Sequence, residues 1–175
     1  EKVIGVAFDG IGYGADGNIW GGEFLLADCR DFRRVGQLKY LALPGGDKAV
    51  DEPWRMAISL LVDSFGERIP EIDFTNRWKN KIPTVRAMIE KRINSPLTSS
   101  IGRFFDGVSS LLGICDINSY EGQAAMELES VAEEQICSSV GLIHQNYEYQ
   151  IREEEGSFIV EPAGIIRSIV DDLRK

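Results

Sequence analysis

The chain has 175 residues and a formal net charge of −9, and 43% of its residues are hydrophobic and 27% charged. That length suits one globular domain with a buried core, and hardly two. The composition excludes a disordered chain, a coiled coil and a collagen-like repeat, and the acidic charge argues against a nucleic-acid or anionic-lipid partner. No apolar run approaches the roughly 20 residues that span a bilayer, and no secretory signal pattern opens the chain.

The cysteines and the single histidine limit the possible chemistry. Cys29, Cys115 and Cys137 lie far apart without CxxC spacing, so we expect reduced thiols packed as small hydrophobes in a cytoplasmic protein. His144 is the one histidine, which argues against a His-rich metal site or the usual Ser–His–Asp triad within this sequence. Because the sequence opens on Glu1 and enters a strand pattern directly, we expect it to be an internal part of a longer polypeptide.

Three strands are predicted at the start of the chain. Residues 3–8 form a short apolar run that ends before Asp9, which is typical of a buried strand. Asp16-Gly17 predicts a type I′ hairpin turn. Residues 19–26 and 34–43 then predict two further strands. Successive strands joined by tight turns indicate an antiparallel meander.

The pattern changes to that of helices beyond residue 52. The strongest helix signal covers residues 99–112, whose apolar positions recur at the spacing of one buried face and end at Gly113. Residues 73–82 allow no assignment. The other predicted helices cover residues 53–65, 83–93, 122–135 and 163–173, and two more strands are predicted at residues 147–151 and 157–160. The fold class is therefore α/β with layered α and β parts, a strand meander followed mostly by helices.

A carboxylate and three glycines stand at the end of the first predicted strand: Asp9, Gly10, Gly12 and Gly14. We expect the glycines to form a turn whose backbone N–H groups can face an anion, while the carboxylate can hold a divalent ion beside a phosphate. The spacing matches neither the dinucleotide fingerprint nor the Walker A loop. A strand, an acidic glycine turn and a hairpin are how the actin and sugar-kinase class builds its phosphate loops. A glycine-rich turn without any ligand is the alternative.

Three other motifs could also contact a ligand. Gly21-Gly22, in the second predicted strand, destabilise it unless a ligand or a packed aromatic such as Trp20 approaches their backbone. Asp106 lies beside the apolar face of the strongest helix, where it either contacts a ligand or is bonded to nearby backbone. At the start of the next helix, Glu121, Gly122 and Glu127 suit ribose hydroxyls or an amine, although a solvent-facing helix start has the same composition.

Taken together and in order, these motifs resemble the HypF carbamoyltransferases of nickel–iron hydrogenase maturation. The resemblance covers nearly the whole chain and implies that residues 1–175 are one partial domain, most of the second subdomain of the carbamoyl-transfer domain. That domain has the actin-like ATPase (ASKHA) fold and is similar to the threonylcarbamoyl transferases of tRNA modification. The motifs are residues 6–14 (VAFDGIGYG), 19–23 (IWGGE), 43–47 (LPGGD), 53–55 (PWR) and 120–125 (YEGQAA).

The resemblance implies a reaction and roles for individual residues. The family uses carbamoyl phosphate and ATP to make carbamoyl-adenylate, and passes the carbamoyl group to the C-terminal cysteine of a partner, HypE, on the route to cyanide ligands. It implies a divalent metal (iron, zinc or magnesium) in the complete domain. The residues that match are Asp9 for the metal, Gly10, Gly12 and Gly14 for the nucleotide phosphate, and Asp106, Glu121, Gly122 and Glu127 for the nucleoside.

The sequence also departs from the family pattern. The family's paired metal-binding histidines lie upstream of the first strand and a further aspartate ligand lies downstream, so the resemblance implies that this chain alone binds metal poorly and is inactive. Two alternatives stay open. One is an O-carbamoyltransferase that acts on a small hydroxyl substrate, and the other is a non-catalytic nucleotide-binding module of the actin-like fold.

Overall fold

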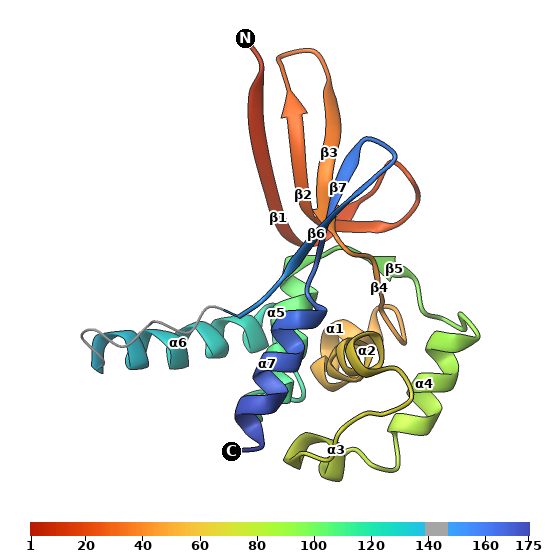
Figure 1. Cartoon of the computed structure of the whole chain (residues 1–175), viewed down its shortest axis with the longest axis vertical. Helices are drawn as coiled ribbons and strands as arrows, with labels where there is room; N and C mark the ends of the chain where they lie inside the picture. Colours follow the sequence, from red (N-terminus) through yellow and green to blue (C-terminus); the bar gives the residue numbers. More distant parts are fainter. Residues whose placement is uncertain (139–146) are drawn as a thin grey trace.

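The computed structural model describes residues 1–138 and 147–175, and it describes no side chains for residues 135–138. Within these residues the chain has a mixed α/β fold, in which one seven-stranded sheet lies at one end of the molecule and the helices lie at the other (Figure 1). No helix in the described part is long and apolar enough to cross a membrane. The layering of a sheet and a helical body agrees with the predicted fold class.

The sheet is built around the predicted antiparallel meander. Its three long strands are β1 (Val3–Tyr13), β2 (Ile19–Ala27) and β3 (Phe32–Leu38), and β2 pairs with both others. β7 (Ser157–Glu161) adds to β3 in parallel and β6 (Gln150–Glu154) pairs antiparallel with β7. The short strands β4 (Leu41–Ala42) and β5 (Leu97–Thr98) pair with each other, and β5 also pairs with the start of β2. The sheet therefore joins segments from both ends of the chain.

The structure corrects the prediction for the first strand and its turn. β1 runs on through the predicted glycine turn to Tyr13, and its apolar side chains are exposed, with Val6 at 55%. Among the strands of the described part of the chain, β1 pairs with β2 alone, so the apolar run marks an edge strand rather than a buried one. Gly17, but not Asp16, has a positive φ, and the Gly17 N–H donates to the Gly14 carbonyl. The loop is therefore a three-residue connection and not a type I′ turn.

The helical body follows the predicted periodicity closely. α2 (Pro53–Phe65), α4 (Ile82–Glu90), α5 (Ile101–Leu111), α6 (Gln123–Ser138) and α7 (Ala163–Leu173) all fall on predicted helices. Two short helices, α1 (Lys48–Asp51) and α3 (Asp73–Arg77), carry too few turns to show a period and were not predicted. The predicted third strand breaks into β3 and β4, and β6 begins three residues later than predicted.

Helix α2 lies at the centre of the core. Its buried face, together with α5 and α7, forms one apolar cluster that continues to Phe74 of α3 and to Val85 of α4. Gly107 allows α5 to lie directly against α2, because a Cβ atom there would fall 2.5 Å from Leu60 Cδ1. Trp54 stacks on Trp78, with ring centroids 4.4 Å apart. The helical body thus has an apolar core of its own.

The cysteine prediction holds in one case and fails in another. Cys115 is buried and free, as expected, whereas Cys29 is free but exposed. Cys29 lies in the exposed connection between β2 and β3, which offers no interior to pack into. The side chain of Cys137 and the whole of His144 lie outside the described residues.

Candidate functional site

Asp9 lies in a bulge of β1. β1 pairs in one register up to Phe8, opposite Gly22, and in a shifted register from Gly12, opposite Trp20. Residues 9–11 therefore face Gly21 alone. A bulge of this kind bends a strand and redirects its side chains. Asp9 is exposed and its Oδ1 atom accepts a hydrogen bond from the Gly10 N–H at 2.6 Å, so the bulge presents a carboxylate to solvent.

The three glycines near Asp9 do not form the predicted turn. Gly10 lies in the bulge, Gly12 pairs with Trp20 in the sheet, and Gly14 begins the hairpin loop, where its N–H donates to the Asn18 carbonyl at 3.0 Å. Because the strand continues, their N–H groups do not converge on one point as a phosphate nest would. The contact of Gly10, Gly12 and Gly14 with a nucleotide stays a prediction.

Gly21 and Gly22 are explained by contact with the protein's own backbone. A Cβ atom on Gly21 would fall 2.4 Å from the Asp9 carbonyl oxygen, and one on Gly22 would fall 2.3 Å from the Ser99 carbonyl oxygen. Both distances are too short for any side chain. The paired glycines therefore let β2 lie between the bulge of β1 and the segment that leads into α5. Neither a ligand nor the Trp20 ring is needed to account for them.

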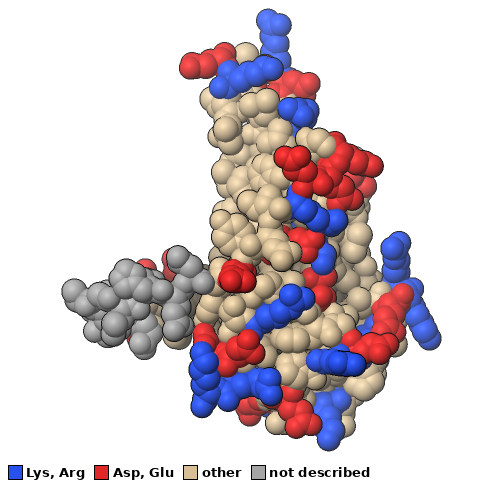
Figure 2. Space-filling view, viewed as in Figure 1, with Lys and Arg blue, Asp and Glu red and all other residues tan. Residues whose placement is uncertain are grey.

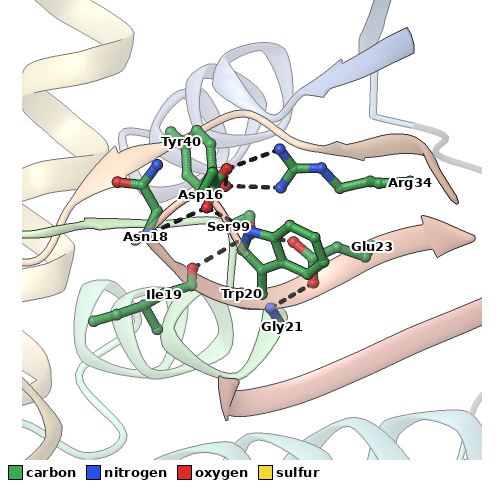
Figure 3. A network of polar contacts seen from close by, with 9 residues as sticks. All are labelled: Asp16, Asn18, Ile19, Trp20, Gly21, Glu23, Arg34, Tyr40 and Ser99. Atoms are coloured by element: carbon green, nitrogen blue, oxygen red, sulfur yellow. Dashed lines mark hydrogen bonds and ion pairs between the residues drawn. The ribbon is translucent and has the colours of Figure 1, made fainter. Parts of the chain in front are cut away.

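The buried carboxylate of Glu23 is hydrogen-bonded both to β2 and to the segment before α5. Glu23 is 2% exposed, and its Oε2 atom accepts hydrogen bonds from the N–H groups of Gly21 at 2.6 Å and Gly22 at 2.8 Å. Its Oε1 atom accepts from the hydroxyl of Ser99, just before α5 (Figure 3). Ser100 caps α5 by accepting from the Arg103 N–H at 3.1 Å, and its hydroxyl lies 2.7 Å from the carbonyl oxygens of Asp9 and Gly10. The start of α5 is thus bonded to the bulge.

A second polar network lies around Asp16 in the hairpin loop (Figure 3). Its carboxylate accepts from the Trp20 ring N–H at 2.9 Å, the Arg34 guanidinium at 2.9 Å and the Tyr40 hydroxyl at 2.6 Å. The Arg34 guanidinium also stacks over the Trp20 ring at 4.2 Å. Partial burial raises the pKa of Asp16, but these hydrogen bonds and one from the Asn18 N–H outweigh burial and hold the pKa well below its usual range.

Asp106 is fully buried on α5 rather than open to a ligand. Its partner is Arg103, one turn earlier, with the two charged groups 3.1 Å apart. Burial raises the pKa of Asp106 to about 6, and the charge of Arg103 offsets part of that rise. The Arg103 guanidinium lies against the bulge, since a Cβ atom on Gly10 would be 3.5 Å from its Nη2 atom. The predicted residues Asp9 and Asp106 are therefore connected through Gly10 and Arg103.

The other three predicted residues lie at the start of α6. Glu121 is exposed, Gly122 has a φ of 78°, and Glu127 accepts a hydrogen bond from the Gln123 amide at 2.7 Å. Burial, followed by the charges of Glu127 and Asp106, raises the pKa of the Cys115 thiol. The charges of Glu127 and Asp106 are thus both felt at this thiol, while Glu121 is exposed beside Gly122.

Asp9 fits one ligand of a metal site and not a whole site. Within residues 1–138 and 147–175, no group of three or more His, Cys, Asp or Glu side chains could hold a metal ion. The exposed carboxylate of Asp9 is a hard oxygen donor that suits Mg²⁺, and it can also serve iron or zinc. The described residues therefore do not complete a set of three ligands around it.

Sequence reasoning did not identify Glu23, Ser99, Ser100 and Arg103 as site residues. One signal was available for Ser100, because a serine just before an amphipathic helix is a preferred N-cap. For Glu23 the signal was an acid at an inward position of a strand, directly after two glycines. Two of its partners, Gly21 and Gly22, precede it directly, but Ser99 lies 76 residues away, so the sequence alone does not pair Glu23 with Ser99.

Comparisons with known proteins match this chain to one family of carbamoyltransferases over nearly its whole length. The model of a family described as carbamoyltransferase, Kae1-like domain, second subdomain, matches residues 5–175. Carbamoyltransferase HypF2 of Cupriavidus necator is 49% identical over 133 residues, which cover 76% of this chain and 16% of that protein. The probable carbamoyltransferase HypF of Methanocaldococcus jannaschii is 36% identical over 182 residues, covering 94% of this chain and 24% of that protein.

A solved structure matches as well. The crystal structure of full-length HypF in a phosphate- and nucleotide-bound form superposes with a TM-score of 0.80 and 36% identity, over 99% of this chain and 22% of that one. The chain therefore spans between 16% and 24% of the length of these three relatives.

Proposed function

Since the chain belongs to the HypF family of carbamoyltransferases, we propose that it forms part of an enzyme that transfers a carbamoyl group. The proposed donor is carbamoyl-adenylate, made from carbamoyl phosphate and ATP, and the proposed acceptor is the C-terminal cysteine of HypE. The product serves cyanide-ligand synthesis in nickel–iron hydrogenase maturation. In this proposal the chain is the second subdomain of the carbamoyl-transfer domain, with the actin-like ATPase (ASKHA) fold, in a longer cytoplasmic polypeptide.

The bulge of β1 is the observation that carries the proposal. It presents the Asp9 carboxylate to solvent, while the Asp9 carbonyl group accepts a hydrogen bond from the Ser100 hydroxyl and packs closely against Gly21. A carboxylate on so firmly held a segment suits metal or phosphate chemistry, which depends on fixed geometry. A full-length HypF relative, of which this chain covers 22%, has been solved in a phosphate- and nucleotide-bound form, which supports nucleotide chemistry in the complete enzyme.

Each part of the proposed site has a defined task. Asp9 supplies one oxygen ligand, and a divalent ion bound there adds Lewis acidity and neutralises phosphate charge. Gly10 is the candidate for backbone contact with the phosphate beside Asp9, because it carries no side chain. The attacking thiolate comes from the partner protein, so neither Cys29 nor Cys115 needs to react.

The nucleoside side of the proposed site runs along α5 and α6. Asp106 and Glu127 are the candidates for ribose or amine contacts, with Gly122 and Glu121 at the start of α6. Asp106 is buried by the described residues, so this role requires α5 and α6 to separate at the nucleotide. Arg103 would then remain next to Asp106, and one oxygen of the Asp106 carboxylate would accept a hydrogen bond from a ligand hydroxyl.

The Asp9→Ala substitution in the full-length protein tests the proposal directly. We expect carbamoyl transfer to HypE to fall below detection, measured as radiolabelled carbamoyl on the acceptor protein, because one metal ligand is lost. Asp51→Ala is a matched control, since Asp51 is also an exposed aspartate and lies at the end of α1. Wild-type transfer by Asp9→Ala would refute the role of Asp9. Transfer to a small hydroxyl compound but not to HypE would favour an O-carbamoyltransferase instead.

A further inference from the structure

Glu23 joins two elements that contact the bulge around Asp9, strand β2 and the segment before α5. Its two carboxylate oxygens accept from Gly21 and Gly22 of β2 and from Ser99, which precedes α5. Gly21 is the one residue of β2 that faces the bulge. The residue after Ser99 is bonded to the carbonyl oxygens of Asp9 and Gly10. One buried carboxylate therefore ties both supports of the bulge together.

Hydrogen bonds rather than a cation stabilise this buried carboxylate. Among the described residues no Lys or Arg forms an ion pair with Glu23, and a buried carboxylate without partners is costly. Three donors satisfy it, and the N-terminus of α5, which begins two residues after Ser99, also favours negative charge. Removal of the carboxylate would leave the Gly21 and Gly22 N–H groups buried without an acceptor.

We propose that Glu23 is a positioning residue for the Asp9 site, a role that rests on the function proposed above. Glu23 does not contact the ligand, because it is 2% exposed and its carboxylate is directed to Gly21 and Ser99 (Figure 3). It fixes the backbone of Gly21 and the position of Ser99, and through them the direction in which the bulge aims the Asp9 carboxylate. Loss of such indirect support for a metal ligand typically weakens metal binding by about 10- to 100-fold.

Two substitutions of Glu23 differ in the hydrogen bonds that they retain. In Glu23→Gln the amide oxygen can still accept from both glycine N–H groups, and the amide nitrogen can donate to the Ser99 hydroxyl oxygen. In Glu23→Ala all three hydrogen bonds are lost. Glu23→Gln is therefore expected to retain function and Glu23→Ala to lose it, even though both remove the charge.

The experiment measures Zn²⁺ affinity, by competition with a chromophoric chelator, and carbamoyl transfer in the full-length protein. For Glu23→Ala we expect the Zn²⁺ dissociation constant to rise at least about 10-fold and kcat to fall, with Glu23→Gln within about threefold of wild type. Val170→Ala, which leaves a cavity beneath the buried face of α7, is the control for a loss of stability without a change at the site. If Glu23→Ala cannot be purified folded, Ser99→Ala, which removes a single donor, should show the same loss to a smaller degree.

The outcomes separate this inference from the proposed function. Glu23→Ala, or Ser99→Ala in its place, with Zn²⁺ affinity and transfer equal to those of Val170→Ala would overturn the positioning role, even if Asp9→Ala abolishes transfer. An equal loss in Glu23→Gln and Glu23→Ala would overturn it too, because charge rather than hydrogen-bond geometry would then matter. If Asp9→Ala itself retains Zn²⁺ affinity and transfer, the proposed function of the site fails instead.

Discussion

The helical body and the bulged end of the sheet are held together by different forces. In the helical body, α2, α5 and α7 share an apolar core. At the bulge, residues of β1, β2 and the segment before α5 meet through close backbone contacts and a buried carboxylate. Most of the surface over β1 in Figure 2 is uncharged, and the apolar side chains of that strand are open to solvent. Apolar burial gives the molecule its stability, whereas hydrogen bonds and shape give the site its geometry.

The largest expected effect tests apolar burial in the two regions. Phe74 is 1% exposed, whereas Val6 on β1 is 55% exposed. Phe74→Ala should lower the free energy of unfolding by about 4 kcal/mol, because it removes a large buried side chain and leaves a cavity. Val6→Ala should lower it by less than about 1 kcal/mol. Urea denaturation of both variants measures this, and equal losses would show that β1 is buried in solution.

The next effect tests shape at the bulge. Gly21→Ala places a Cβ atom 2.4 Å from the Asp9 carbonyl oxygen, whereas at Gly5, in the same hairpin, the nearest atom would be 3.8 Å away. Gly21→Ala should therefore cost about 2 to 3 kcal/mol of stability through overpacking. Gly5→Ala should be neutral or slightly stabilising, since alanine suits a strand better than glycine. A neutral Gly21→Ala would mean that the bulge can move away from β2 freely.

These two regions also differ in how far the sequence predicts them. The period of the apolar residues in α5 and α7 is a local signal, and it placed both helices within about two residues. The family resemblance, carried by short ordered motifs, is confirmed by the comparisons. In contrast, the continuation of β1 through Gly10 and Gly12 depends on pairing with β2, which competes with the turn preference of glycine.

The same contrast between local signals and long-range contacts explains which residues of the candidate site the sequence indicates. Asp9 stands out locally as an acid among glycines, and the structure does place it at an exposed bulge. The partner of Asp106 is Arg103, only three residues away, but its burial depends on the packing of α5 against α2 and α6. Glu23 needs Ser99 from a distant segment. Contacts between distant segments follow from the folded topology, which local patterns do not encode.

A smaller effect concerns the buried pair on α5 and its dependence on pH. The folded-state pKa of Asp106 is about 6, above the ordinary value of about 3.9. Between these values the folded protein holds a proton that the unfolded chain has released, so stability falls as pH rises through this window and then levels off. In Asp106→Asn this contribution disappears. The stability difference between wild type and variant should change by on the order of 2 kcal/mol from pH 4 to pH 6, measured by urea denaturation at each pH. A constant difference would show that Asp106 titrates normally.

The smallest effect concerns the network around Asp16, which holds the hairpin loop by hydrogen bonds and by the ion pair between Asp16 and Arg34. In Asp16→Asn an amide group replaces one carboxylate oxygen and cannot accept from Arg34 or Tyr40, so stability at pH 7 should fall by about 1 kcal/mol, a modest loss because the group is partly exposed. The pKa of Asp16 lies below its usual range, so its contribution is complete above the unfolded-state pKa of roughly 3.9. That contribution is lost as pH falls through the lower folded-state pKa. Tyr40→Phe removes one of the donors and should cause part of the same loss. If Asp16→Asn weakened Zn²⁺ binding as strongly as Glu23→Ala does, both networks would aim Asp9, and the distinction between an outer structural network and an inner positioning one would not hold.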